Sequence, residues 1–316
     1  MVIHKRIAFE RILCPVDLLP DSEAALRYTA SFARACGAKL LICHCRDSAE
    51  TGGPSEARRI KKSLARLVEQ AGLSDTDGLW ESVVVDGNPV VAIPRVAADS
   101  RIDLIVMRSR RWQDSRALLG SLAEAICRIS PCPVLITHPR NGEPGESETD
   151  SPLRRVCVAY DFSSDAELAL SYGLHLALRH GAEMHLLHIL PMRVKTESPE
   201  VAMLPLSARL GFDEIKTRLR SAVSEQTGFI VEIKHAMREG QPYREVLAYA
   251  EEQAIDLICM GASGTGFGLH ALFGSNADRV LRQARCPVII ARPLRPTMPI
   301  ASGPEPGARS IARLRV

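Results

Sequence analysis

Short apolar stretches alternate with segments of helical spacing along most of the chain. In the first half, apolar runs rich in β-branched residues are separated by segments such as 24–33, where alanines and aromatic residues recur at helical intervals. The strands predicted in this half are Ile12–Val16, Lys39–Cys43, Ser82–Val85, Leu104–Met107 and Val134–Thr137. Strands that are apolar throughout and alternate with helices predict a parallel sheet covered by helices on both faces.

The second half of the chain repeats the first. Val16–Leu26 resembles Tyr160–Leu170 at an offset of 144, and further matches follow in the same order. The last match pairs Cys132-Pro-Val with Cys286-Pro-Val at an offset of 154. The corresponding predicted strands are Val156–Ala159, Met184–Ile189, Ile230–His235, Leu257–Met260 and Val288–Ala291. We therefore predict an α/β chain of two tandem doubly wound domains, each with a five-stranded parallel sheet.

The repeat also predicts the domain boundaries. The domains are expected at 1–140 and 153–293, joined by a linker at 141–152 that is rich in proline, glycine and acidic residues. The tail, 294–316, is basic and lacks apolar periodicity, so we predict that it is mostly disordered. Binding of a partner or an acidic surface by this tail is the alternative.

Composition narrows the classes of partner. A length of 316 residues suits two domains, and a net charge of +3 spread over both halves gives no broad basic surface for nucleic acid. No apolar run approaches the length of a signal peptide's core or a membrane span. The sequence predicts a cytoplasmic protein that binds neither nucleic acid nor membrane.

Nine cysteines give no sign of a disulfide framework, since several lie inside apolar stretches. The one local cluster is Cys43-His44-Cys45, where alternation along a strand places both sulfurs on one face. Zinc needs about four ligands, and no second motif supplies the rest. We predict a buried strand and no metal, with metal binding at this cluster as the alternative.

Candidate chemistry gathers after the fourth strand of the second repeat. In such sheets ligands bind at the carboxyl ends of the strands, where the strand order reverses. There, glycines cluster between Gly261 and Gly274, and a helix is predicted over 276–284. Glycines let successive backbone amides face an anion, and the helix start adds unpaired N–H groups. The loop therefore predicts a phosphate site.

Asp161 follows the first strand of the same repeat. The sequence Ser164-Asp-Ala-Glu167 fits a capping box that opens the next helix. The carboxylate of Asp161 is placed to accept hydrogen bonds from ribose hydroxyls or a base amine, although capping the helix is an equal alternative.

These residues resemble a known family. Gly261, Gly264, Gly274 and Ser275 form the spacing GxxG, nine residues, then GS, and together with Asp161 and the closing Cys-Pro-Val strand this resembles the ATP-binding class of universal stress proteins. The resemblance implies an adenine nucleotide alpha hydrolase-like fold that holds ATP or AMP, with or without Mg²⁺. It also implies pairing of the two domains within the chain, with a homodimer as a further possibility. The residues implied to hold the nucleotide are Asp161, Ile189, Met260, Gly261, Gly264, Gly274, Ser275 and Asn276.

The first repeat departs from this pattern. Asp17, Gly120 and Ser121 remain, but Arg108 and Arg111 replace the two leading glycines. A side chain there fills the space of a phosphate, so the same binding mode is expected to fail. The arginines either are solvated or plug the pocket, or they bind a different anion.

The sequence favours a nucleotide-dependent sensor over an efficient enzyme. It assembles no nucleophile, base and orienting group, and no Walker lysine follows the glycine loop. His270, inside that loop, is interpreted as a surface residue. We predict no catalytic residues, weak ATP hydrolysis at most, and an unidentified protein partner. The alternatives are a scaffold without nucleotide and a hydrolase of adenosine compounds.

Overall fold

A computed structural model describes most of both halves of the chain. The described residues are 8–19, 21–46, 54–74, 78–109, 120–138, 153–190, 212–224, 232–263, 274–291 and 312–314. They divide into two compact units, an N-terminal domain drawn from 8–138 with 312–314, and a C-terminal domain drawn from 153–291. The predicted linker at 141–152 lies outside the described residues, as do Arg111, Gly264 and His270.

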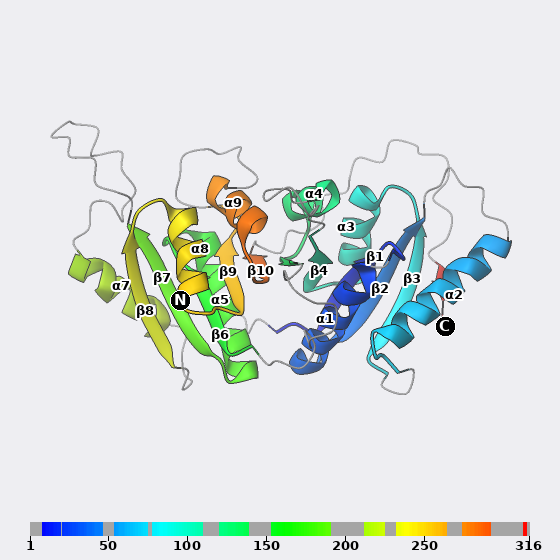
Figure 1. Ribbon diagram of the computed structural model, residues 1–316, viewed down its shortest axis with the longest axis horizontal. Helices are drawn as coiled ribbons and strands as arrows, with labels where there is room; N and C mark the ends of the chain where they lie inside the picture. Colours follow the sequence, from blue (N-terminus) through cyan, green and yellow to red (C-terminus); the bar gives the residue numbers. More distant parts are fainter. Residues whose placement is uncertain are drawn as a thin grey trace. The chain divides into compact units, whose positions relative to one another are not determined.

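The N-terminal domain alternates strands and helices as predicted (Figure 1). Its strands stand in the order β3-β2-β1-β4-β5, all parallel. Its elements are β1 (Arg11–Val16), α1 (Asp21–Cys36), β2 (Lys39–Arg46), α2 (Pro54–Gln70), β3 (Trp80–Asp86), α3 (Pro89–Asp99), β4 (Leu104–Arg108), α4 (Ser121–Ile129) and β5 (Val134–Thr137).

The C-terminal domain has the same topology, with the strand order β8-β7-β6-β9-β10. Its elements are β6 (Arg155–Ala159), α5 (Ser164–His180), β7 (Glu183–Leu190), α7 (Phe212–Ser224), β8 (Ile233–Glu239), α8 (Pro242–Glu252), β9 (Leu257–Gly261), α9 (Ser275–Gln283) and β10 (Val288–Ala291). The predicted fold class, two doubly wound domains with five parallel strands each, is confirmed.

Consecutive residues of the central strands are buried, which requires a cover on both faces of each sheet. Ile12, Leu13 and Cys14 of β1 have no exposed surface, and neither do Val156, Cys157 and Val158 of β6. In the N-terminal domain α1 packs against β1, β2 and β4, while α3 contacts β2 and α4 contacts β5. These unbroken apolar runs are what a buried parallel strand needs, since neither face meets water.

Two differences from the predicted elements have local causes. The third strand of the C-terminal domain begins at Ile233, not at 230, because residue 232 is already irregular and the pairing with β7 starts at Met184 opposite Ile233. In the tail, Ala312–Leu314 forms a further strand, β11, which pairs antiparallel with β3. These three residues pair there because the edge of β3 offers unpaired backbone groups to another segment. The rest of the tail, predicted to be mostly disordered, lies outside the described residues.

Gly173 allows α5 to pack closely on β6. A Cβ atom added at Gly173 lies 2.4 Å from Cγ2 of Val158. We expect Gly173→Ala to lower the free energy of unfolding by about 1–3 kcal/mol, because the helix must move away from the sheet. Urea denaturation followed by circular dichroism measures this loss.

The N-terminal copy suggests the control for this prediction. At the equivalent positions it has Thr29 and Cys14, whose Oγ1 and Sγ atoms lie 3.5 Å apart. Adding Val158→Cys to Gly173→Ala should restore part of the lost stability. An unchanged or higher stability in the single variant would contradict this view of the contact.

Candidate functional site

The strand order places the candidate residues of the C-terminal domain at one edge. From β6 the chain continues to β7 on one side of β6, and it later returns to β9 on the other side of β6. The strand order therefore reverses between β6 and β9. Ala159, at the end of β6, stands between Leu187 of β7 and Met260 of β9. Asp161 and Gly261 follow these paired residues, and Ile189 lies two residues beyond Leu187. The carboxyl ends of the three strands thus bring these predicted residues together.

A strained turn joins β6 to α5. Phe162 has a φ of 64°, in the left-handed region that residues other than glycine rarely adopt. The Asp161 Oδ1 atom accepts a hydrogen bond from the Ser163 backbone N–H at 3.0 Å, which closes the turn. Non-glycine residues in this conformation cluster at binding sites, where surrounding contacts hold them in place.

The helix cap differs from the predicted capping box. Ser163, not Ser164, caps α5: its Oγ accepts from the Ala166 N–H at 3.1 Å. The cap moves back by one residue because the turn at Phe162 leaves Ser163 extended, with φ −80° and ψ 160°. The side chain of Glu167 instead accepts a hydrogen bond from the hydroxyl of Tyr160. Asp161 therefore shapes the turn before the cap.

The first residues of the glycine loop are hydrogen-bonded to the start of α5 and to its cap. The Ser263 N–H donates to Asp165 Oδ2 at 3.0 Å, and Ser163 Oγ donates to the Ser263 carbonyl at 3.4 Å. A Cβ atom at Gly261 would lie 2.7 Å from Cβ of Asp165 and 3.1 Å from the Ala166 nitrogen. Gly261 is thus required by helix packing, a reason that the sequence pattern did not indicate.

The other end of the loop opens α9. The Gly274 N–H donates to the Ala262 carbonyl at 2.7 Å, which brings the two ends of the loop side by side. Gly274 is the N-cap of α9 and has no side chain to cap it. Ser275 and Asn276, in the first turn, are exposed. The N–H groups at the start of a helix lack partners within it, so this turn is suited to bind an anion.

His188, which the sequence analysis did not single out, lies under the turn at Phe162. Its Nδ1 donates to the Tyr160 carbonyl at 2.7 Å, and its ring meets the ring of Phe162 edge to face at 5.0 Å between centroids. His44 contacts the Val16 carbonyl in the same way, at 3.0 Å. The signal was present, because the two histidines match in the internal repeat.

The comparisons with known proteins agree with this architecture. The model of the universal stress protein family matches twice, at residues 8–138 and 152–292. This chain belongs to the universal stress protein family. Universal stress protein Rv2005c of Mycobacterium tuberculosis is 25% identical over 294 residues, which cover 89% of this chain and 96% of that protein.

Solved structures of universal stress proteins are also similar. One from Archaeoglobus fulgidus covers 89% of this chain and 98% of its own, with a TM-score of 0.63 and 23% identity, which supports the fold. A universal stress protein in complex with cAMP covers 42% of this chain and 98% of its own, with 27% identity and a TM-score of 0.34.

The N-terminal universal stress protein domain keeps the turn but changes its surroundings. Leu18 has a φ of 62°, like Phe162 at the equivalent position. Asp17 Oδ1 accepts hydrogen bonds from Ser22 Oγ, in the first turn of α1, at 2.6 Å and from the Leu19 N–H at 3.1 Å. Half-buried Arg108 ends β4 where Gly261 ends β9. The two domains therefore differ in the polar and charged groups that they present at this edge of the sheet.

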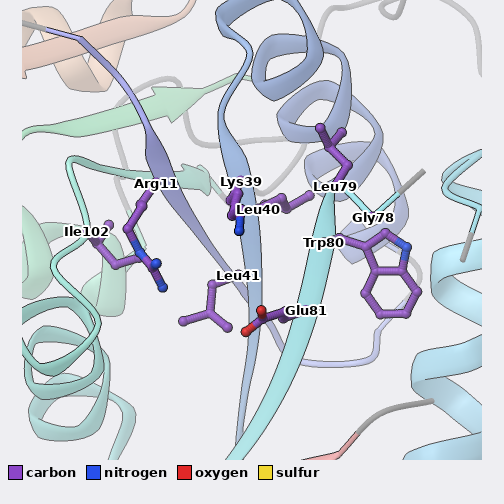
Figure 2. A pocket seen from close by; sticks show the side chains of 9 residues that line it. All are labelled: Arg11, Lys39, Leu40, Leu41, Gly78, Leu79, Trp80, Glu81 and Ile102. Carbon is purple, nitrogen blue, oxygen red and sulfur yellow. The ribbon is translucent and has the colours of Figure 1, made fainter. Parts of the chain in front are cut away.

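A small pocket in the N-terminal domain lies at the opposite, amino-terminal edge of the sheet (Figure 2). It offers about 20 Å³ of space for water, which suits roughly one molecule and no nucleotide. The Nε of Arg11 is buried there without a hydrogen-bond partner among the described residues, as a bound water would explain. The pocket is lined by Arg11, Lys39, Leu40, Leu41, Gly78, Leu79, Trp80, Glu81 and Ile102.

Acid is expected to destabilise the C-terminal universal stress protein domain. Burial lowers the pKa of His188, with the Tyr160 carbonyl and Asp161 opposing it in part. Burial likewise lowers the pKa of three more histidines of this domain, His180, His185 and His235. A lowered pKa means that the unfolded chain binds more protons, so stability falls as pH drops below about 6.5.

Thermal unfolding at pH 7.5 and 5.5, followed by circular dichroism, tests this expectation. The melting temperature of the C-terminal domain should be lower at pH 5.5. In His188→Gln, which keeps a donor for Tyr160 but does not titrate in this range, the decrease should be smaller. Equal melting temperatures at both pH values in the natural chain would contradict it.

None of the described helices is long and apolar enough to cross a membrane.

Proposed function

We propose that the C-terminal domain binds an adenine nucleotide at the edge formed by β6, β7, β9 and the start of α9. Adenosine contacts Asp161 and the backbone around Ile189 and Met260. The phosphates contact Gly261, Gly264, Gly274, Ser275 and Asn276. One observation supports this proposal most: the strained turn at Phe162 and the uncapped start of α9 lie at the same edge of the sheet. The two features are connected by the hydrogen bonds of Ser263 with Asp165 and of Gly274 with Ala262, at the two ends of the glycine loop.

Affinity on this proposal comes mainly from charge-assisted hydrogen bonds. Each bond between a phosphate oxygen and a backbone N–H of the loop or of α9 contributes roughly 1.5–3 kcal/mol. Three or four such bonds support micromolar binding, about −8 kcal/mol, after the costs of association. The half-buried Asp161 adds an acceptor for ribose hydroxyls or a base amine, which favours a nucleoside over free phosphate.

The proposed role of the nucleotide is regulatory. ATP, with or without Mg²⁺, binds at the loop whose two ends are held by Ser263 and Gly274, and the surface that includes the bound nucleotide binds a protein partner differently from the empty surface. Slow hydrolysis is a by-product of holding ATP. On this proposal the N-terminal domain does not bind the nucleotide. Arg108 stands there at the position of Gly261, and Asp17 accepts a hydrogen bond from Ser22 Oγ.

Hydrogen exchange of the full chain with and without ATP tests this proposal. Slower exchange is expected at residues 257–263 and 274–283, with no change in the matching segments 104–109 and 120–129 of the N-terminal domain. Unchanged exchange at the first two segments would contradict nucleotide binding there and favour a scaffold. Protection of the N-terminal segments instead would assign the nucleotide to the other copy.

A hydrolase of adenosine compounds is the second candidate, because Asp161 lies at the proposed nucleotide edge. It predicts steady turnover of ATP that disappears in Asp161→Ala. The regulatory proposal predicts turnover that is negligible beside binding, measured as phosphate release over hours at saturating ATP.

A further inference from the structure

Two exposed arginines gather around a tyrosine where α8 and α9 begin. Tyr243 lies in the first turn of α8, and its hydroxyl accepts a hydrogen bond from Arg244 Nε at 2.9 Å. Arg279 comes from α9, which packs against α8 (Figure 1), and its Cζ atom lies 4.6 Å from the centre of the Tyr243 ring. This cation–π contact holds the guanidinium of Arg279 beside the start of α8.

Neither arginine is neutralised by an acid in the described part of the chain. No carboxylate there lies within ion-pair distance of Arg244 or Arg279, and Asp278, which precedes Arg279, pairs with Arg282 instead. The hydrogen bond from Arg244 lowers the pKa of the Tyr243 hydroxyl, and the charges of Arg244 and Arg279 act in the same direction. The start of α8 therefore carries positive charge that is free to meet an anion.

Arg279 belongs to the same face of α9 as the proposed phosphate contacts. Ser275 and Asn276 precede it by four and three residues, a spacing that places side chains on one face of a helix. Four residues correspond to about 6 Å along the helix axis. Helices α8 and α9 follow β8 and β9, whose carboxyl ends lie at the same edge of the sheet. Arg279 thus stands about one helical turn from the proposed phosphate site.

The N-terminal copy lacks this cluster. The three equivalent positions carry neither a charge nor an aromatic ring, and their residues are Val90, Val91 and Ala125. The helix start also differs, because Asn88 caps α3 by accepting a hydrogen bond from the Val90 N–H at 2.9 Å. Gln241, at the same position before α8, makes no such bond. The cluster is therefore specific to the domain proposed to bind the nucleotide, and the shared fold does not require it.

We propose that Arg279 binds the terminal phosphate of ATP and makes the C-terminal domain select nucleoside triphosphates over monophosphates. This inference rests on the proposed function and names the class of nucleotide that the site takes. Backbone N–H groups of the loop and of α9 serve one phosphate, whereas the additional negative charges of a triphosphate favour a cation nearby. The planar guanidinium presents paired donors to phosphate oxygens, and the Tyr243 ring holds it in place before the nucleotide binds.

Calorimetric titration of the full chain with ATP and with AMP, in the same magnesium buffer, tests this selectivity. The natural chain is expected to bind ATP at least about 10-fold more tightly than AMP. In Arg279→Ala, which copies Ala125, the affinity for ATP should fall about 10-fold and the affinity for AMP should not change. Arg285→Ala is the control, because Arg285 follows the other end of α9 and pairs with Glu251. It should leave both affinities unchanged.

Variants of Tyr243 test how Arg279 is held. Tyr243→Val, which copies Val90, removes the ring and should weaken ATP binding about 2–5-fold without an effect on AMP. Tyr243→Phe keeps the ring and should keep the natural selectivity. Both variants should keep the melting temperature of the natural chain, since Tyr243 is only half-buried. Equal losses of ATP affinity in the two variants would overturn the role of the ring.

Two results would overturn the selectivity and leave the nucleotide site in place. One is an Arg279→Ala variant whose affinities for ATP and AMP are unchanged or are lowered by the same factor. The other is a natural chain that binds ATP and AMP equally tightly. Failure of the natural chain to bind either nucleotide would instead overturn the proposed function, and this inference with it.

Discussion

Replacing both Gly261 and Gly264 by arginine is expected to weaken ATP binding at least about 100-fold. This Gly261→Arg/Gly264→Arg variant copies the first repeat into the second. It removes the close approach of backbone amides to the phosphates, and the loss of two charge-assisted hydrogen bonds costs about 3 kcal/mol or more. Calorimetric titration with Mg–ATP measures the change.

The contact between Gly261 and α5 makes a control necessary. Arginine at Gly261 also displaces the first turn of α5, because a Cβ there lies 2.7 Å from Cβ of Asp165. The single variant Gly264→Arg avoids this contact and should still lose most of the affinity. Arg108→Gly in the N-terminal domain should leave ATP affinity unchanged. A double variant that binds ATP as tightly as the natural chain would contradict the proposed phosphate contacts.

Asp161→Ala is expected to weaken ATP binding about 10–100-fold. A carboxylate that accepts a hydrogen bond from a bound ribose or base contributes about 1.5–3 kcal/mol. Part of the effect comes from the turn, since Asp161 also accepts from the Ser163 N–H at 3.0 Å. Asp161→Asn keeps an acceptor for that bond, so comparing the two variants separates the turn from the ligand.

The internal repeat supplies the matched control for Asp161. Asp17→Ala removes the equivalent carboxylate, which accepts from the Leu19 N–H in the same way. ATP affinity should not change, although the N-terminal domain should lose stability with its Ser22 contact. Equal losses of affinity in Asp17→Ala and Asp161→Ala would mean that both copies take part in binding, contrary to the proposal.

The fold was predictable from the sequence because its signals are local. Each central strand is an unbroken apolar run, and each appears twice in the chain. β8 is the strand whose bounds the sequence predicts least well, since all of its residues are half-buried or exposed and its sequence, IKHAMRE, carries little apolar pattern. β11 carries no local signal either, because it is defined by the free edge of β3, far away in the sequence.

The candidate site was predictable in its location more than in its contacts. Strand order alone places Asp161, Ile189 and Met260 at one edge. The left-handed turn at Phe162 was not foreseen, since a phenylalanine gives no sign of positive φ. That turn moved the cap to Ser163. The sequence indicates only a phosphate contact for Gly261, because its contact with Asp165 depends on how α5 packs against β9, which residue spacing does not encode.

The stoichiometry of ATP binding to the natural full-length chain tests the central claim most directly. Calorimetric titration with Mg–ATP is predicted to give one site per chain, with a dissociation constant in the micromolar range. Two equivalent sites would contradict the claim that the N-terminal domain is silent. No binding would contradict the nucleotide site altogether and would favour a universal stress protein that acts as a scaffold.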